Sequence, residues 1–348
     1  MTNNFNLVNE SALLRVLHVI PYDGVGGVEI AAKSMGSVRQ GRVVFSLSFI
    51  FQNIKNRNDV WRTFNLFMII SAARIISRSK VDVVVVSLWR SAIVGIFVKL
   101  FSRKTKLVTF LHCAQSKHFF DYCFNRLAML FSDAVWVDSS QTMTQRVPPS
   151  YRSRCRVISF VTRRIEATQE MPVRPIFIFW GRLTAQKDLE KAIRIFLGIY
   201  QKRPDARFLL IGPDGGALHK LQSLVTTLKI RDAVTFLGQL THAEIGQHAA
   251  FASFYLQTSV YEGMAMSVVE SMQLGLVPVV TPVGEIAAYC VHGKNALIVE
   301  SEKQIIEDIL NLFEDSNCYG NLRANAIATW ENSMLYRDSI LAACEALV

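Results

Sequence analysis

Continuous apolar runs that recur along the chain are the feature that most constrains its fold. Most of these runs consist of Val, Ile, Leu and Phe, without the polar alternation of a sheet that faces water on one side. Such runs indicate strands buried on both faces, as in a parallel sheet, where helices connect successive strands. In the first half we therefore expect strands at residues 15–20, 43–50, 81–86, 106–111 and 134–137, and a helix at residues 28–40.

The same alternation restarts after residues 165–175, where polar residues and two prolines interrupt the pattern. At 348 residues the chain is also longer than a single hydrophobic core usually serves. We therefore expect an α/β fold with two Rossmann-like doubly wound domains, residues 1–168 and 169–330, and a C-terminal helical segment, residues 331–348, that can cross back to the first domain. Ligands should bind beyond the carboxyl ends of the strands, in a cleft between the domains. The second half predicts strands at residues 176–180, 206–211, 233–237, 253–257 and 277–280, and helices at residues 188–203, 217–229, 242–249 and 266–274.

Charge is divided unevenly along the chain. Residues 1–170 carry 23 Lys and Arg against 10 Asp and Glu, a net charge of +13, whereas residues 171–348 carry 15 against 18, a net charge of −3. The basic half fits an anionic partner, namely a bilayer surface, nucleic acid or a phosphorylated acceptor, although a solvated basic face is the simpler alternative. No stacking-aromatic or zinc module accompanies the charge, which disfavours nucleic acid.

The location of the protein is predicted from its N-terminus and its apolar runs. Residues 1–11 are polar and lack the cationic start and apolar run of a signal peptide. Charged residues interrupt the apolar runs before they reach the length of a spanning helix. We expect a cytoplasmic protein that can bind peripherally to the inner face of the cell membrane. Residues 91–106 fit either a helix lying on an anionic leaflet or a buried helix followed by a basic loop.

The segment 262–270 carries the strongest chemical signal. A strand is expected to end near residue 257, a loop holds Glu262, Gly263 permits close backbone approach, and a helix then begins. The free N–H groups and the dipole of a helix start form an anion site that suits a diphosphate. Glu262 can then reach a sugar hydroxyl and Glu270 a ribose. Because two glutamates eight residues apart occur by chance in many chains, this pair alone is weak evidence.

Together with residues 268–272 and 275–284, this segment resembles the donor-domain signature of retaining glycosyltransferase family 4, of the bacterial surface-polysaccharide type. In that family the two glutamates are also separated by seven residues. The resemblance implies the GT-B fold and a nucleotide-sugar donor. It also implies donor contacts at Gly263, Met264, Ala265, Met266 and Glu270.

Other stretches extend the resemblance. Residues 179–188, of sequence FWGRLTAQKD, resemble the family's first donor loop, whose Arg and Lys bind the diphosphate, and this implies such roles for Arg182 and Lys187. Cations at this position would offset the charge of the departing diphosphate. The remaining resemblance implies donor contacts at Gly212, Leu237 and Gly238, at the loop of Gly26 and Gly27, and at His112 near the donor sugar.

Three departures from the family pattern bear on donor identity. The usual Phe-Gly after Glu-Gly is Met264-Ala265 here, which adds a methyl group where backbone meets donor. Residues 156–164 lack the usual Asn-Gly-Val-Asp sequence, and a shorter segment leaves the role of Glu285 open.

The activity implied is a retaining transfer of a hexose or N-acetylhexosamine from a UDP- or GDP-type sugar to a glycan acceptor. The basic half predicts that this acceptor is lipid-linked, as in lipopolysaccharide, O-antigen or capsule synthesis. Because no pair of carboxylates suits double displacement, we expect front-face transfer with Arg182, Lys187, Glu262 and His112 as the catalytic set. No cofactor or metal is implied, since no Asp-x-Asp occurs. The alternatives are a nucleotide-sugar 2-epimerase of the same architecture and a glycosyltransferase-like subunit without activity.

Overall fold

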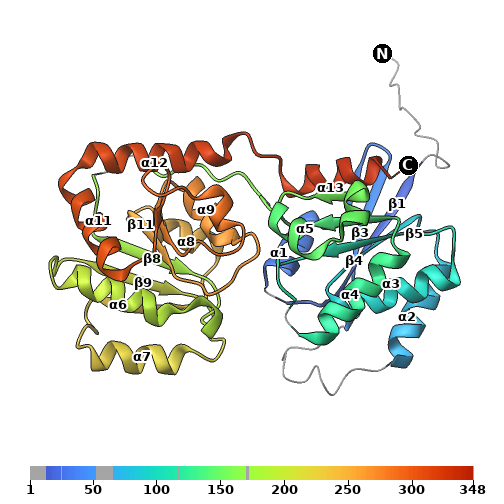
Figure 1. Ribbon diagram of the computed structural model, residues 1–348, viewed down its shortest axis with the longest axis horizontal. Helices are drawn as coiled ribbons and strands as arrows, with labels where there is room; N and C mark the ends of the chain where they lie inside the picture. The colour runs from blue at the N-terminus through green and yellow to red at the C-terminus, as the bar shows by residue number, and fades with distance from the viewer. Residues whose placement is uncertain (1–12, 25, 52–65, 117, 170–171, 348) are drawn as a thin grey trace, which may run out of the picture. The chain divides into compact units, whose positions relative to one another are not determined.

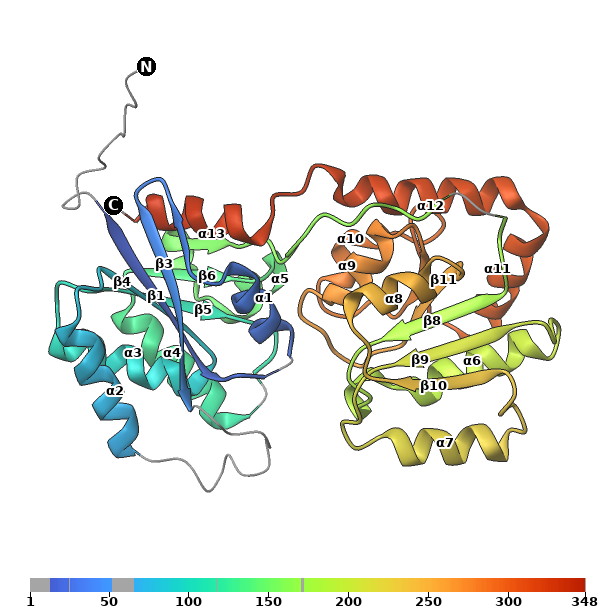
Figure 2. The same ribbon diagram turned by 180° about the vertical axis from the view of Figure 1, so that it is seen from behind.

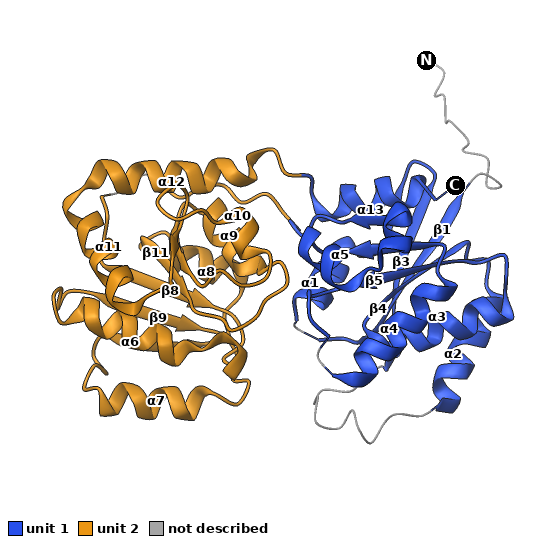
Figure 3. Ribbon diagram, in the orientation of Figure 1, with its two compact units in different colours: residues 1–162, 334–348 blue, residues 163–333 orange. Residues whose placement is uncertain are grey.

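The computed structural model describes residues 13–24, 26–51, 66–116, 118–169 and 172–347, so the expectation about residues 1–11 lies outside it. The chain forms two compact units (Figure 3). Unit 1 contains Met1–Thr162 and Met334–Val348, and unit 2 contains Arg163–Ser333. Within the described residues, no helix has both the length and the apolar character needed to cross a bilayer.

Unit 1 is built on a seven-stranded sheet with the order β2-β3-β1-β4-β5-β6-β7. All neighbouring strands are parallel except β2, which runs antiparallel to β3. Its strands are β1 (Leu14–Tyr22), β2 (Val38–Gln40), β3 (Val43–Phe51), β4 (Val83–Ser87), β5 (Lys106–Leu111), β6 (Ala134–Val137) and β7 (Cys155–Val157). Helices α2 (Leu66–Arg78), α3 (Trp89–Phe101) and α4 (Phe119–Phe131) form one layer on this sheet (Figures 1 and 2). Helices α1 (Gly27–Met35), α5 (Ser140–Arg146) and the short 3-10 helix η3 (Pro149–Arg154) also belong to unit 1.

The first helix is shorter than its sequence predicts. The expected helix at residues 28–40 ends at Met35, because Gly36 adopts a left-handed backbone with a φ of 58°. Residues 38–40 then form the edge strand β2. The prediction of helix over these last residues was therefore wrong.

Unit 2 is built on a six-stranded parallel sheet with the order β10-β9-β8-β11-β12-β13. Its strands are β8 (Ile176–Trp180), β9 (Arg207–Ile211), β10 (Val234–Gly238), β11 (Phe254–Gln257), β12 (Val277–Val280) and β13 (Leu297–Ile298). Its helices are η4 (Ala185–Lys187), α6 (Leu189–Tyr200), α7 (Leu218–Thr227), α8 (His242–Ala249), α9 (Met266–Gln273), α10 (Ile286–Tyr289), α11 (Glu302–Glu314) and α12 (Ser316–Glu331). The doubly wound α/β alternation is confirmed, whereas β13 and α10 were not predicted.

The last helix, α13 (Tyr336–Glu345), belongs to unit 1, as the expected crossing back requires. The Tyr336 N–H donates to Val161 O over 2.7 Å, and the Ser159 N–H donates to the Ser339 hydroxyl over 3.1 Å. Residues 163–168, which the sequence grouped with the first domain, lie in unit 2, where the Thr168 N–H donates to Leu274 O over 3.1 Å.

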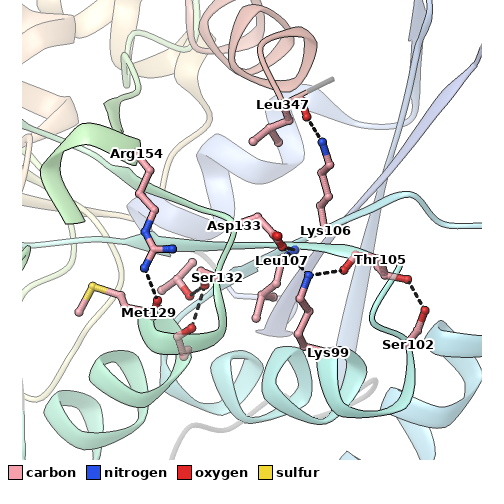
Figure 4. Close-up of polar contacts among 12 residues, drawn as sticks. Lys99, Ser102, Thr105, Lys106, Leu107, Met129, Ser132, Asp133, Arg154 and Leu347 are labelled. Carbon is pink, nitrogen blue, oxygen red and sulfur yellow. Dashed lines mark hydrogen bonds and ion pairs between the residues drawn. The ribbon is translucent and has the colours of Figure 1, made fainter. Parts of the chain in front are cut away.

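Helix α3 bears on the membrane contact expected for residues 91–106. Residues 91–96 and Val98 are buried, so most of the apolar stretch belongs to the core of unit 1. Lys99 Nζ contacts Asp133 Oδ2 at 2.8 Å and Thr105 O at 3.1 Å, and Lys106 donates to Leu347 O (Figure 4). The structure therefore favours the buried helix. Most apolar side chains of residues 91–106 are buried, and two of the four cations in this stretch contact other groups of unit 1.

Candidate functional site

Three glycine turns meet where β8, β9 and β10 end. The Gly181 N–H donates to Ile211 O over 2.9 Å, and the Gly212 N–H donates to Gly238 O over 2.7 Å. Gly212 has a φ of 144°, and a Cβ atom at this position would overlap the Gly181 carbonyl group. Backbone packing thus requires glycine at position 212. The hydrogen bond to Gly238 links the loop after β9 to the loop after β10, which follows the half-buried Leu237.

The loop after β8 presents Arg182. Its side chain lies over Gly215, where an added Cβ would come within 2.8 Å of Arg182 Cγ. Arg182 is half-buried, and within the described residues it forms no ion pair. Its guanidinium group can therefore bind an anionic ligand.

Lys187 and Glu262 form an ion pair at the same edge of the sheet. Lys187 Nζ lies 2.6 Å from Glu262 Oε1, and their side chains are only 14% and 8% exposed. The two residues come together because β8 and β11 are neighbours, so the loops that follow them share one edge. A diphosphate bound here would compete with Glu262 for the Lys187 ammonium group.

Gln257, which the sequence marked only as a strand end, connects this ion pair to the core. Its buried amide Nε2 donates to Glu262 Oε1 over 3.3 Å. Its Oε1 accepts hydrogen bonds from the Tyr255 hydroxyl at 2.8 Å and the Ser267 hydroxyl at 3.1 Å. This network fixes the Gln257 amide, which in turn orients the Glu262 carboxylate.

The start of α9 is held in an unusual backbone conformation. Ala265, its N-cap, has a φ of 55° and a ψ of 65°, in the left-handed region. Gly284, with a φ of 60°, packs directly against the backbone of Glu262 and Gly263. This turn leaves Gly263, Met264 and Met266 partly exposed around the helix start.

Replacing Ala265 with glycine is expected to stabilise unit 2 by about 1 kcal/mol, because an L-residue in the left-handed region carries a steric cost that glycine avoids. Urea-induced unfolding measures this change. As a control, Ala192→Gly within α6 should instead destabilise the unit by about 1 kcal/mol. A loss of stability in Ala265→Gly would contradict the assignment of strain to this turn.

Glu270 is buried and already has partners. Its Oε2 accepts a hydrogen bond from Trp180 Nε1 at 3.1 Å, and its Oε1 lies 3.5 Å from Arg163 Nη2 and 3.9 Å from His242 Nδ1. Arg163 belongs to unit 2. The sequence did not mark Trp180 or His242 as a partner of Glu270, because Trp180 was expected only as the end of a strand and His242 only as the start of a helix.

The predicted residues of unit 1 lie at the carboxyl ends of β1 and β5. Gly26 is the N-cap of α1 and Gly27 its first residue, and the Glu29 carboxylate lies directly against Gly26. His112 Nε2 lies 2.9 Å from the Ser87 hydroxyl.

Ser87 also joins His112 to a second histidine, which the sequence did not single out. His18 Nε2 lies 2.7 Å from the same hydroxyl, and burial lowers the pKa of His18 to about 3. The His18 ring is therefore neutral, and the Ser87 hydroxyl bridges the two histidine rings. His18 lies within β1 and Ser87 is the last residue of β4, beside runs that indicated only buried strands, so spacing offered no signal for them.

Among the described residues, no group of three or more His, Cys, Asp and Glu side chains is arranged to hold a metal ion.

Solved structures define the fold class. HepE of Anabaena, in complex with UDP and glucose, superimposes with a TM-score of 0.78 at 16% sequence identity, over 96% of this chain and 99% of that one. A sucrose-phosphate synthase from Thermosynechococcus elongatus gives a TM-score of 0.77 at 15% identity, over 96% of this chain and 98% of that one. The architecture is the two-domain α/β GT-B fold of glycosyltransferases, as the sequence predicted.

Sequence similarity indicates which proteins the chain is related to. Residues 162–329 match the family model described as glycosyl transferases group 1. The alpha-monoglucosyldiacylglycerol synthase of Acholeplasma laidlawii is 23% identical over 182 residues, 51% of this chain and 44% of that protein. The chain spans about half the length of the curated relatives it matches. It is therefore related to glycosyltransferase enzymes through the unit that carries Arg182, Lys187, Glu262 and Glu270.

Proposed function

We propose that this protein is a metal-independent retaining glycosyltransferase that moves a hexose or N-acetylhexosamine from a nucleotide-diphosphate sugar to a glycan acceptor. The observation that carries the proposal is the buried ion pair of Lys187 and Glu262, beside Arg182 and the start of α9. It lies within the segment that matches group 1 glycosyltransferases.

In the proposed reaction, unit 2 holds the donor. Arg182, Lys187 and the N–H groups at the start of α9 bind the diphosphate, and Glu270 accepts hydrogen bonds from the ribose hydroxyls. When the diphosphate enters, the Lys187 ammonium group shifts from Glu262 to a phosphate oxygen. Glu262, still held by Gln257, then accepts a hydrogen bond from a sugar hydroxyl.

The bond between the anomeric carbon and the diphosphate oxygen breaks on the face where the acceptor hydroxyl attacks. The departing diphosphate takes the acceptor's proton, so configuration is kept without an enzyme nucleophile. Arg182 and Lys187 stabilise the charge that develops on the leaving oxygen.

We further propose a lipid-linked acceptor, in the synthesis of lipopolysaccharide, O-antigen or capsule. The net charge of +13 on residues 1–170 supports an anionic acceptor. A relative named alpha-monoglucosyldiacylglycerol synthase supports a lipid substrate.

Incubation with labelled UDP- and GDP-sugars tests the proposal. We expect saturable binding of one donor, and sugar transfer to a lipid-linked glycan extract with retained anomeric configuration. Conversion of the donor to its 2-epimer without acceptor would instead identify an epimerase. If no nucleotide sugar of the panel binds, the protein is better explained as a glycosyltransferase-like subunit without activity.

A further inference from the structure

The outer surface of one helical layer in unit 1 is unusually apolar. Helices α2 and α4 pack on either side of α3 (Figures 1 and 2). Twelve of the eighteen large apolar side chains exposed among the described residues lie on these three helices. Monomeric soluble proteins rarely expose such a patch without a partner for it. We call this surface the α2–α4 face.

Helical periodicity shows that these side chains point away from the core as ordered stripes. On α4 the outward stripe is Phe119, Tyr122, Arg126, Leu127 and Leu130. On α2 it is Phe67, Ser71, Arg74, Ile75 and Arg78. The most exposed of these apolar side chains are Phe67, Phe119 and Ile75, at 76%, 73% and 68%. An outward stripe normally carries polar residues, so both helices present apolar groups where solvent is expected.

The end of α3 adds exposed apolar side chains beside the α2 stripe. Leu100 and Phe101 are exposed there, and the Arg74 guanidinium group of α2 lies 5.7 Å from the centre of the Phe101 ring. Arg103 and Lys104 follow on the exposed loop.

The charge on the α2–α4 face has one sign. Exposed Arg74, Arg78 and Arg126 lie among the apolar side chains. The acidic residue of these three helices, Asp121, is buried and forms an ion pair with Arg146 at 3.3 Å. A second copy of the chain bound face to face would bring arginine-bearing surfaces together without acids to pair them. Apolar side chains interspersed with arginines match a surface that is itself apolar and anionic.

We propose that the α2–α4 face binds the surface of an anionic phospholipid bilayer, with its apolar side chains inserted among the headgroups and its arginines on lipid phosphates. This differs from the contact expected from the sequence, because α3 contributes only its exposed end. The proposal rests on the proposed function for its purpose, which is to bring the enzyme to a lipid-linked acceptor. Lipid binding itself needs neither donor nor acceptor.

Flotation with vesicles tests the proposal without any nucleotide sugar, so membrane binding and glycosyl transfer can fail separately. We expect the protein to float with phosphatidylcholine vesicles that contain phosphatidylglycerol at low salt, less at high salt, and weakly with phosphatidylcholine alone. The variant Ile75→Gln with Leu130→Gln should bind at least about tenfold more weakly, since two apolar side chains lose their insertion. Arg74→Gln with Arg78→Gln should weaken binding only to the anionic vesicles, by about tenfold or more.

Phe251→Gln with Val291→Gln is the matched control, because both are exposed apolar residues of unit 2. It should float like the unmodified protein, and circular dichroism should show every variant folded. The proposal is overturned if the unmodified protein does not float, or if Ile75→Gln with Leu130→Gln floats equally well. It is also overturned if sedimentation shows a dimer that this variant abolishes, since the face would then join two copies of the chain.

Discussion

Replacing Lys187 with methionine should lower the rate of sugar transfer at saturating donor about a hundredfold or more. The reason is that its ammonium group is expected to stabilise the departing diphosphate. Removing one preorganised group that stabilises the charge of the transition state typically lowers kcat by two to three orders of magnitude. Methionine keeps much of the side chain's length and apolar stem, so the change is chiefly one of charge. Steady-state kinetics measures the loss, with the donor that binds in the panel of UDP- and GDP-sugars.

Stability must be separated from catalysis in this variant, because Lys187 also neutralises a buried carboxylate. Removing it leaves Glu262 without its cation and should destabilise unit 2 by about 3 kcal/mol. Adding Glu262→Gln to Lys187→Met removes the unpaired charge, so stability should largely return while transfer stays lost. Recovery of transfer in the double variant would assign Lys187 a purely structural role.

Lys220→Met is the matched control for the loss of a lysine from unit 2. Lys220 is 73% exposed and pairs with Glu190 on the surface, where ion pairs contribute little. We expect its transfer rate to remain within about twofold of the unmodified protein, because this pair lies outside the candidate site.

Most strands of both sheets could be predicted because each is marked by an apolar run in the local sequence. The runs at residues 106–111, 134–137, 176–180 and 277–280 matched their strands at both ends, since a strand buried on both faces has few polar residues. Edge elements could not be predicted in this way. β2 and β13 have three and two residues, too short for any pattern. The end of α1 depends on the conformation of Gly36, which a helical pattern does not reveal.

The candidate site was only partly predictable, for a different reason. Motif resemblance marked Lys187 and Glu262 as separate ligands of a donor. Their mutual ion pair depends on the adjacency of β8 and β11, which are far apart in the chain. Gln257 was invisible as a positioning group, because a polar residue at the end of a strand usually indicates the start of a loop. Its partners Tyr255 and Ser267 become meaningful only once the fold has buried their hydroxyl groups.

Replacing Gly212 with alanine should destabilise unit 2 by about 3 kcal/mol and weaken donor binding at the same time. The new Cβ would overlap the Gly181 carbonyl group, and both are backbone positions that cannot move aside as a flexible side chain can. Relief requires the loops after β8 and β9 to separate, which also shifts Arg182. Gly246→Ala in α8 is the control, because a Cβ there meets nothing and alanine favours a helix. If Gly212→Ala unfolds in urea like the unmodified protein, these loops are not held by their glycines, and Arg182 needs another explanation for its position.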